Sequence, residues 1–157
     1  MDKHPRANLE KKAGLGKRFA ARFLDGLLIG VIFGAIFFVI GGVGGAASGE
    51  NNAVVTGLAG AYLFMLIGFP FIYFLYHTIM EAMYGYTLGK HALGLVITDE
   101  SGSDITWVDS IVRNVFRLVG FFFSPFSALL AVILIAVNDD EQRLGDMAGS
   151  TVVVEQA

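Results

Sequence analysis

The chain has 157 residues, of which 55% are hydrophobic and only 16% charged, and its formal net charge is −3 at pH 7. This length suits one compact bundle without a second domain of ordinary size, and so few charges are unusual for a soluble protein. The absence of cysteine excludes disulfides, thiolate metal sites and cysteine nucleophiles. The chain also lacks HExxH, GxSxG and glycine-rich phosphate-loop motifs, so we expect no enzyme activity, no cofactor and no resident metal.

Residues 1–14 are polar and show no apolar periodicity, so we predict a mobile N-terminal tail. Seven of the eleven Lys and Arg residues precede the first long apolar run, namely Lys3, Arg6, Lys11, Lys12, Lys17, Arg18 and Arg22. Because positive charge beside a span is retained in the cytoplasm, we place the N-terminus inside, at the plasma membrane. These residues flank a membrane segment without interleaved aromatic side chains, so we expect no nucleic-acid binding.

A first membrane span is predicted within residues 17–40. The 22 residues from 26 to 47 carry no charge, and at about 1.5 Å per residue a helix of this length crosses a hydrocarbon core of about 30 Å. Asp25 lies at the edge of this run, where a carboxylate is costly unless it is paired or faces protein or water. Arg18 and Arg22 share one helical face with Asp25, so we predict a charged cluster at one membrane face.

Glycines repeat every four residues within this span, at Gly26, Gly30 and Gly34. Two overlapping GxxxG patterns remove side chains from one stripe, which lets a second helix approach closely. Glycine is also simply common in membrane helices. We favour a packing stripe, which would contact another helix of the chain or a second copy in a homo-oligomer.

A second span is predicted within residues 53–80, which carry no formal charge. Near its end, Tyr73, His77 and Glu81 lie at i, i+4 and i+8 on one helical face. One interpretation is an aromatic belt, because Tyr and His are at home at a headgroup boundary. The other is a polar line that carries protons or holds a cation.

The remaining chain predicts two strands, at 94–98 and 150–154, separated by apolar helical segments. Arg113 and Arg117 lie at i, i+4, away from the apolar face of the first of these segments. Residues 118–138 are uncharged and could form a third span. Alternatively, residues 106–138 enter the membrane and return, with Ser124-Pro125 near the tip.

We favour the return because it leaves both strands on one side, where their backbone groups can pair. The predicted fold is therefore an all-α helical transmembrane protein with a short cytoplasmic β-pair. It has two full spans, followed by a C-terminal helical hairpin or a third span.

Three blocks in this order resemble the RDD family of small membrane proteins, named for one arginine and two aspartates. They are RFAARFLD from residue 18, GYTLGK from 85 with GLVI from 94, and QRLGD from 142 with AGSTVV from 148. The resemblance covers about residues 14–154 and implies a single membrane domain over 15–157. It places the signature triad on Arg18, Asp25 and Asp146. We add as accessory polar residues Arg22, His77, Glu81, Arg113, Arg117 and Arg143.

The departures from the family pattern are mild. His91 stands where the family often has a basic residue after GK, and its usual AGT is written here as AGST. Asp139-Asp140-Glu141 replaces the basic residues often seen before QRLGD, which weakens the charge argument for a cytoplasmic C-terminus.

Some relatives in this family are associated with exchange of Na⁺ or other monovalent cations for protons, and the resemblance implies the same activity here. A carboxylate near the membrane can bind a proton or a hard cation, so Asp25 and Asp146 would be alternating ligands, assisted by Glu81. Arg18 would tether them and shift their pKa values. The alternative is a non-transporting scaffold or accessory protein, in which the pairs Arg18–Asp25 and Arg143–Asp146 simply lock the cytoplasmic ends of the helices. In both cases the lipid bilayer is the partner, and we expect a homo-oligomer.

Overall fold

The computed structural model describes residues 4–43, 53–123, 126–137 and 141–157. They fall into two compact units. We call Met1–Asp25 with Phe74–Ala157 the sheet unit and Gly26–Tyr73 the two-helix unit. The functional residues predicted from the sequence lie in the sheet unit, except for the three glycines.

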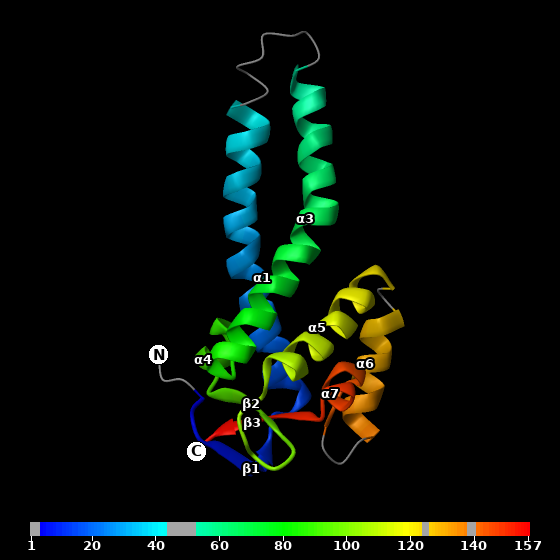
Figure 1. Cartoon of the computed structure of the whole chain (residues 1–157). Helices are drawn as coiled ribbons and strands as arrows, with labels where there is room; N and C mark the ends of the chain where they lie inside the picture. The colour runs from blue at the N-terminus through cyan, green and yellow to red at the C-terminus, as the bar shows by residue number, and fades with distance from the viewer. Residues whose placement is uncertain (1–3, 44–52, 124–125, 138–140) are drawn as a thin grey trace. The chain divides into compact units, whose positions relative to one another are not determined.

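Among the described residues, two helices are long and apolar enough to cross a membrane (Figure 1). They are α1 (Leu15–Phe37), followed by a π-helical segment η1 (Phe38–Val43), and the Gly57–Tyr84 part of α3 (Ala53–Tyr84). Only 22% and 11% of their most apolar windows are buried, whereas the core helix of a soluble protein would be mostly buried. These helices agree with the two predicted spans.

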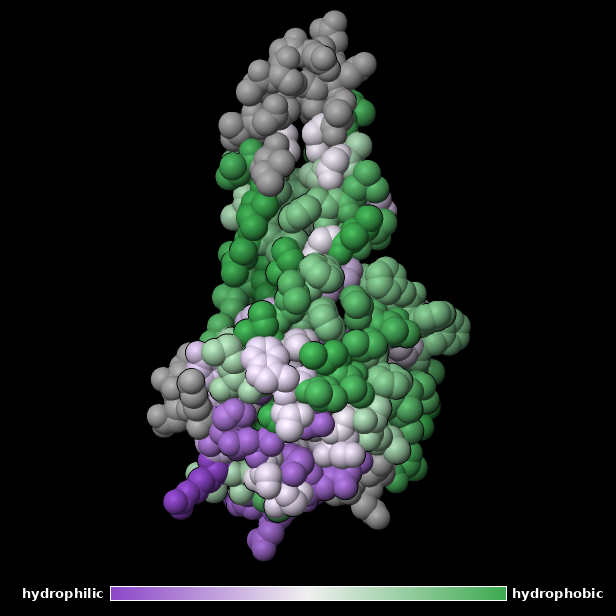
Figure 2. Space-filling view, viewed as in Figure 1, coloured by the Kyte–Doolittle hydropathy of each residue, from purple (hydrophilic) through white to green (hydrophobic). Residues whose placement is uncertain are grey.

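In the two-helix unit, α1 and α3 pack through aromatic side chains. Phe33 is buried, and its ring stacks on Phe64 at 5.5 Å and meets Phe69 edge-on at 5.3 Å between centroids. The outer faces are apolar, as the hydrophobic surface over these helices in Figure 2 shows. An apolar face that no protein covers is typical of a helix in lipid.

The glycine stripe does not make this contact. A Cβ built at Gly26, Gly30 or Gly34 would meet no atom within 4 Å among the described residues. Among the described residues, the contact between α1 and α3 is made by the ring of Phe33 and not by the glycine stripe. Contact with a second copy stays a prediction.

The sheet unit contains a three-stranded antiparallel sheet of order β1-β3-β2. The predicted strand pair is confirmed as β2 (Leu95–Asp99) with β3 (Thr151–Gln156), in a register that sets Val96 opposite Val154. The third strand, β1 (Ala7–Lys12), pairs with the other edge of β3. The sequence predicts a mobile tail there, because polar residues without alternation give no strand signal; pairing with an open strand edge overrides that preference.

The sheet connects to α3 through Gly85, which ends the helix at a φ of 76° and donates its N–H to Glu81 O at 2.8 Å. Such a positive φ is the usual helix end that glycine permits. The Gly85 carbonyl then accepts a bond from the backbone N–H of Ile97 in β2, at 2.7 Å. The last turns of α3 are thereby held beside the sheet.

Four further helices complete the sheet unit: α4 (Leu88–Ala92), α5 (Trp107–Phe122), α6 (Phe126–Val137) and α7 (Leu144–Ala148). α5 and α6 are separate helices joined by a hydrogen bond from Ser127 Oγ to Gly120 O at 2.5 Å. This agrees with the predicted helical hairpin, whereas a third span over 118–138 is not confirmed. The predicted tip at Ser124-Pro125 lies outside the described residues.

α5 has its polar side inward. Ser110, Arg113 and Asn114 are buried, whereas Val108, Ile111, Val115 and Val119 are exposed. This arrangement reverses that of a surface helix in a soluble protein, where the apolar face is covered. It brings a row of polar side chains against α3 and α7.

Candidate functional site

A charge cluster, largely buried except for the exposed Arg22 and the partly exposed Arg143, occupies the interior of the sheet unit. Its cations are Arg18, Arg22, Lys90, Arg113, Arg117 and Arg143, and its carboxylates are Asp25, Glu81 and Asp146. They come from α1, α3, α4, α5 and the start of α7. Together with His77, the six cations and Asp25 line a small cavity of about 30 Å³.

Asp146 is the point where three arginines meet. Its carboxylate lies 3.0 Å from Arg18 Nη1, 3.2 Å from Arg113 Nη1 and 3.2 Å from Arg143 Nη2. The backbone N–H of Arg143 also donates to Oδ2 at 3.2 Å. Burial alone would raise the pKa of Asp146, but the three guanidinium groups hold it well below its usual range. Asp146 is therefore an ionised, fully buried carboxylate.

Arg18 ties the start of α1 to the sheet. Its Nε donates to the Ala13 carbonyl at 2.7 Å and its Nη2 to the Val153 carbonyl at 3.4 Å, while Nη1 contacts Asp146. The bond to Ala13 is local, whereas the other two join residues that are 128 or more positions distant in the sequence. One side chain thus fixes α1, α7 and β3 together.

Arg113 bridges the two ends of the cluster. Its Nε lies 3.3 Å from Glu81 Oε2, and its Nη1 contacts both Asp146 and the hydroxyl of Thr151, the latter at 2.9 Å. The side chain is fully buried, and burial lowers the pKa of Arg113 while Asp146 and Glu81 oppose that shift. α7 approaches α5 closely because residue 145 is glycine: a Cβ there would lie 2.6 Å from the Arg113 carbonyl oxygen.

Glu81 is the second carboxylate centre. Lys90 Nζ lies 2.5 Å and Arg117 Nη2 3.4 Å from its Oε1, and Asn114 Nδ2 donates to its Oε2 at 3.0 Å. His77 Nδ1 lies 3.5 Å away. Burial lowers the pKa of Lys90 to about 8, although Glu81 acts in the opposite direction.

Asp25 is held differently, by uncharged donors. Tyr76 Oη donates to Oδ1 at 2.9 Å, Thr87 Oγ1 donates to Oδ2 at 2.6 Å and the Gly89 N–H donates to Oδ1 at 2.7 Å. α4 can come so close only because residue 89 is glycine, since a Cβ there would lie 2.2 Å from the Ala21 carbonyl oxygen. Asp25 therefore connects α1 to α3 and α4.

The structure thus divides the predicted triad. Arg18 and Asp146 form a direct ion pair, and the predicted pair of Arg143 with Asp146 is present as well. Asp25 lines the same small cavity but has its own set of donors. Of the two aspartates, Asp146 contacts Arg18 directly, whereas Asp25 is turned towards α3 and α4.

The accessory residues all belong to this region. His77 and Glu81 are buried among charged groups, so these two do not form part of an aromatic belt; Arg113 and Arg117 contact Glu81. Arg22 lines the small cavity. Sequence reasoning missed Lys90 and Asn114 as cluster members. A signal existed for Asn114, because Ser110, Arg113, Asn114 and Arg117 form a polar stripe at helical spacing.

Within the described part of the chain, no three His, Asp or Glu side chains are placed to hold a metal ion. The contacts within the cluster are charge-assisted hydrogen bonds and ion pairs between cationic side chains and carboxylates. These bonds join all the elements of the sheet unit that surround the cavity.

The RDD family model matches residues 12–150. Because this match covers most of the chain, the protein belongs to the RDD family, and the apolar helices together with this family indicate a membrane protein. No curated protein and no protein of solved structure matches the chain.

Proposed function

We propose that this RDD-family protein is a non-transporting membrane scaffold or accessory protein whose buried charge cluster is structural. The observation that carries the proposal is Asp146, a buried carboxylate that three arginines already neutralise. A carboxylate that exchanges a proton for a cation must be able to accept either one. The low pKa of Asp146 keeps it from taking up a proton near neutral pH, and its arginines occupy the place of a cation.

The charge balance of the cluster supports the same proposal. Six cationic side chains face three carboxylates, so an incoming monovalent cation would meet net repulsion in a region of low dielectric constant. Glu81 is likewise engaged, by Lys90, Arg113 and Arg117. The arrangement suits a lock between helices and sheet better than an ion pathway.

A second candidate, monovalent cation/proton exchange, is favoured by one observation. Asp25 is held by two hydroxyl groups and a backbone amide, and hydroxyl and carboxylate oxygens are ligands for hard cations. An exchange site would therefore centre on Asp25 with Tyr76 and Thr87, and not on Asp146.

The two candidates differ in a liposome experiment. The protein is reconstituted with an enclosed pH-sensitive dye, and gradients of Na⁺, K⁺ or Li⁺ are imposed. The structural proposal expects no cation-dependent pH change above that of empty liposomes, while an added cation/proton ionophore gives the full signal. A cation-dependent change that Asp25→Asn abolishes would contradict the proposal and establish exchange at Asp25.

A further inference from the structure

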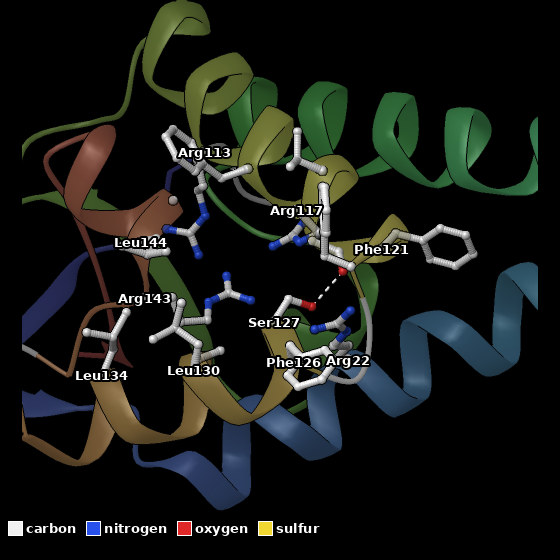
Figure 3. A pocket seen from close by; sticks show the side chains of 16 residues that line it. Arg22, Arg113, Arg117, Phe121, Phe126, Ser127, Leu130, Leu134, Arg143 and Leu144 are labelled. Carbon is white, nitrogen blue, oxygen red and sulfur yellow. Dashed lines mark hydrogen bonds between the residues drawn. The ribbon is translucent and has the colours of Figure 1, made fainter.

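A larger cavity of about 350 Å³ lies in the sheet unit between α5, α6 and the start of α7 (Figure 3). Four arginines, Arg22, Arg113, Arg117 and Arg143, line it, and their guanidinium groups point into the cavity. The wall formed by α6 is apolar and includes Phe126, Leu130 and Leu134. Its volume is within the range of small-molecule sites.

The cavity wall carries more positive than negative charge. Four arginines line it, and no Asp or Glu is among its described lining residues. Glu81 and Asp146 pair with Arg113, Arg117 and Arg143, and Asp25 is held by Tyr76, Thr87 and Gly89. The six cations of the charge cluster nevertheless outnumber its three carboxylates, so positive charge remains in excess. Clustered like charges in a region of low dielectric constant attract an anion and are costly without one.

Arg113 brings a buried guanidinium nitrogen to this cavity that lacks an acceptor among the described residues. Arg113 is fully buried, and its Nη2 has no hydrogen-bond partner within residues 4–43, 53–123, 126–137 and 141–157. Its other two nitrogens contact Glu81, Asp146 and Thr151. A buried guanidinium N–H without a partner is unfavourable, so an acceptor in the cavity would satisfy it.

We propose that this cavity binds an anionic phospholipid, with the phosphate at the four arginines and an acyl chain along α5 and α6. Guanidinium groups match phosphate oxygens in geometry and charge, and basic pockets between membrane helices are known to take lipid headgroups. The apolar wall of α6 would make no favourable contact with an inorganic phosphate ion, but it can pack against a hydrocarbon chain. The exposed apolar faces of α5 and α6 let a lipid approach from the bilayer (Figure 2).

This inference does not depend on whether the protein transports ions. It gives the charge cluster a second role, since the same arginines that surround its carboxylates also hold a lipid phosphate. Phosphatidylglycerol and phosphatidic acid carry the required charge, whereas phosphatidylcholine offers the same chains without a net charge.

The test is lipid binding by the full chain in detergent, followed by native mass spectrometry and by the thermal midpoint. The probes are phosphatidylglycerol, phosphatidylcholine with identical chains, and inorganic phosphate at equal concentration. We expect phosphatidylglycerol to stay bound and to raise the thermal midpoint. Phosphatidylcholine should bind at least about tenfold more weakly, and inorganic phosphate should have no effect on the midpoint. Equal binding of the two lipids, or a shift with phosphate as large as with phosphatidylglycerol, would overturn the proposal.

Variants locate the site. Arg22→Gln changes an exposed arginine at the cavity and should weaken phosphatidylglycerol binding about fivefold, the worth of one basic residue near an anionic lipid. The matched control is Arg6→Gln, which removes an exposed arginine outside the cavity and should have no effect. Ala131→Trp fills the apolar wall, keeps every arginine and should also weaken binding. Equal losses with Arg22→Gln and Arg6→Gln would show non-specific attraction and refute the site.

Discussion

The residues of the charge cluster differ in whether their ion-pair partners are local or distant in the sequence. Arg143 and Asp146 are neighbours on one short segment, whereas Arg18 and Arg113 reach Asp146 from α1 and α5. Asp146 therefore carries the connection between three elements, and its loss leaves more than one buried cation without its acceptor. A buried charge that loses its counter-ion is strongly destabilising.

We predict that Asp146→Asn lowers the free energy of unfolding by about 3–5 kcal/mol, because it breaks a buried ion cluster while keeping the shape of the side chain. Unfolding of the protein in detergent, followed by far-ultraviolet circular dichroism, measures this change. The matched control is Asp104→Asn, whose exposed carboxylate lies 3.5 Å from His4 Nδ1. Surface pairs contribute at most about 1 kcal/mol, so equal effects of both substitutions would refute the role of Asp146.

Asp146 also predicts a dependence on pH. The pKa of its carboxyl is lower in the folded protein than the value of about 4 expected in the unfolded chain. Its contribution is therefore fully present above about pH 4 and is lost as the pH falls further, towards the folded-state pKa. Wild type should lose more stability than Asp146→Asn in denaturant titrations between about pH 4 and pH 2. Parallel pH profiles would contradict this assignment.

At the scale of elements, α4 and α1 illustrate two different uses of glycine. Gly89 lets α4 contact α1, since a Cβ there would lie 2.2 Å from the Ala21 carbonyl oxygen and 2.9 Å from Asp25 Cγ. A Cβ built on Gly30 would have no described atom within 4 Å. At the regularly spaced glycines of α1, no close contact is found among the described residues, whereas the single glycine of the five-residue helix α4 makes a tight contact.

We predict that Gly89→Ala destabilises the protein by about 1–3 kcal/mol, because the added methyl group forces backbone segments apart. The control Gly30→Ala should have no effect or stabilise slightly, since alanine is the better helix former and has space here. Thermal unfolding in the same detergent compares the two variants. A larger loss for Gly30→Ala would show that the glycine stripe is covered, as contact with a second copy would require.

At the scale of the whole molecule, the sheet determines which parts of the chain share one side of a membrane. β2 and β3 are hydrogen-bonded neighbours, so the turn after β2 and the C-terminal end of β3 lie on the same side. β1 belongs to the same sheet and brings the N-terminal basic residues there too. The excess of Lys and Arg predicts that this side is the cytoplasm.

We predict that single cysteines at Ser101 and Glu155, introduced into this cysteine-free chain, are both shielded from an impermeant thiol reagent applied to whole cells. The control Ser48→Cys, between the two spans, should react from outside. Reaction at both Ser101 and Glu155 with protection at position 48 would reverse the predicted orientation. Reaction at 155 alone would contradict the sheet itself, because β2 and β3 could not then be paired.

The sequence alone determined those features that depend on local composition. Two long apolar runs predicted both spans, and β-branched runs predicted β2 and β3. Each follows from hydropathy or from helix and strand periodicity over a few residues, and such signals are present before the chain folds.

Only the tertiary structure decided which distant groups meet. In the folded chain, Arg18 pairs with Asp146 and Lys90 pairs with Glu81. Asp25 accepts hydrogen bonds from Tyr76, Thr87 and Gly89. Residues 7–12 form a strand. The tertiary structure also turned the polar stripe of α5 inward, which makes the arginine-lined cavity. The physical reason is that the packing of the helices and strands determines which counter-ion lies next to a buried charge. That choice depends on the closure of the whole chain and not on spacing within one segment.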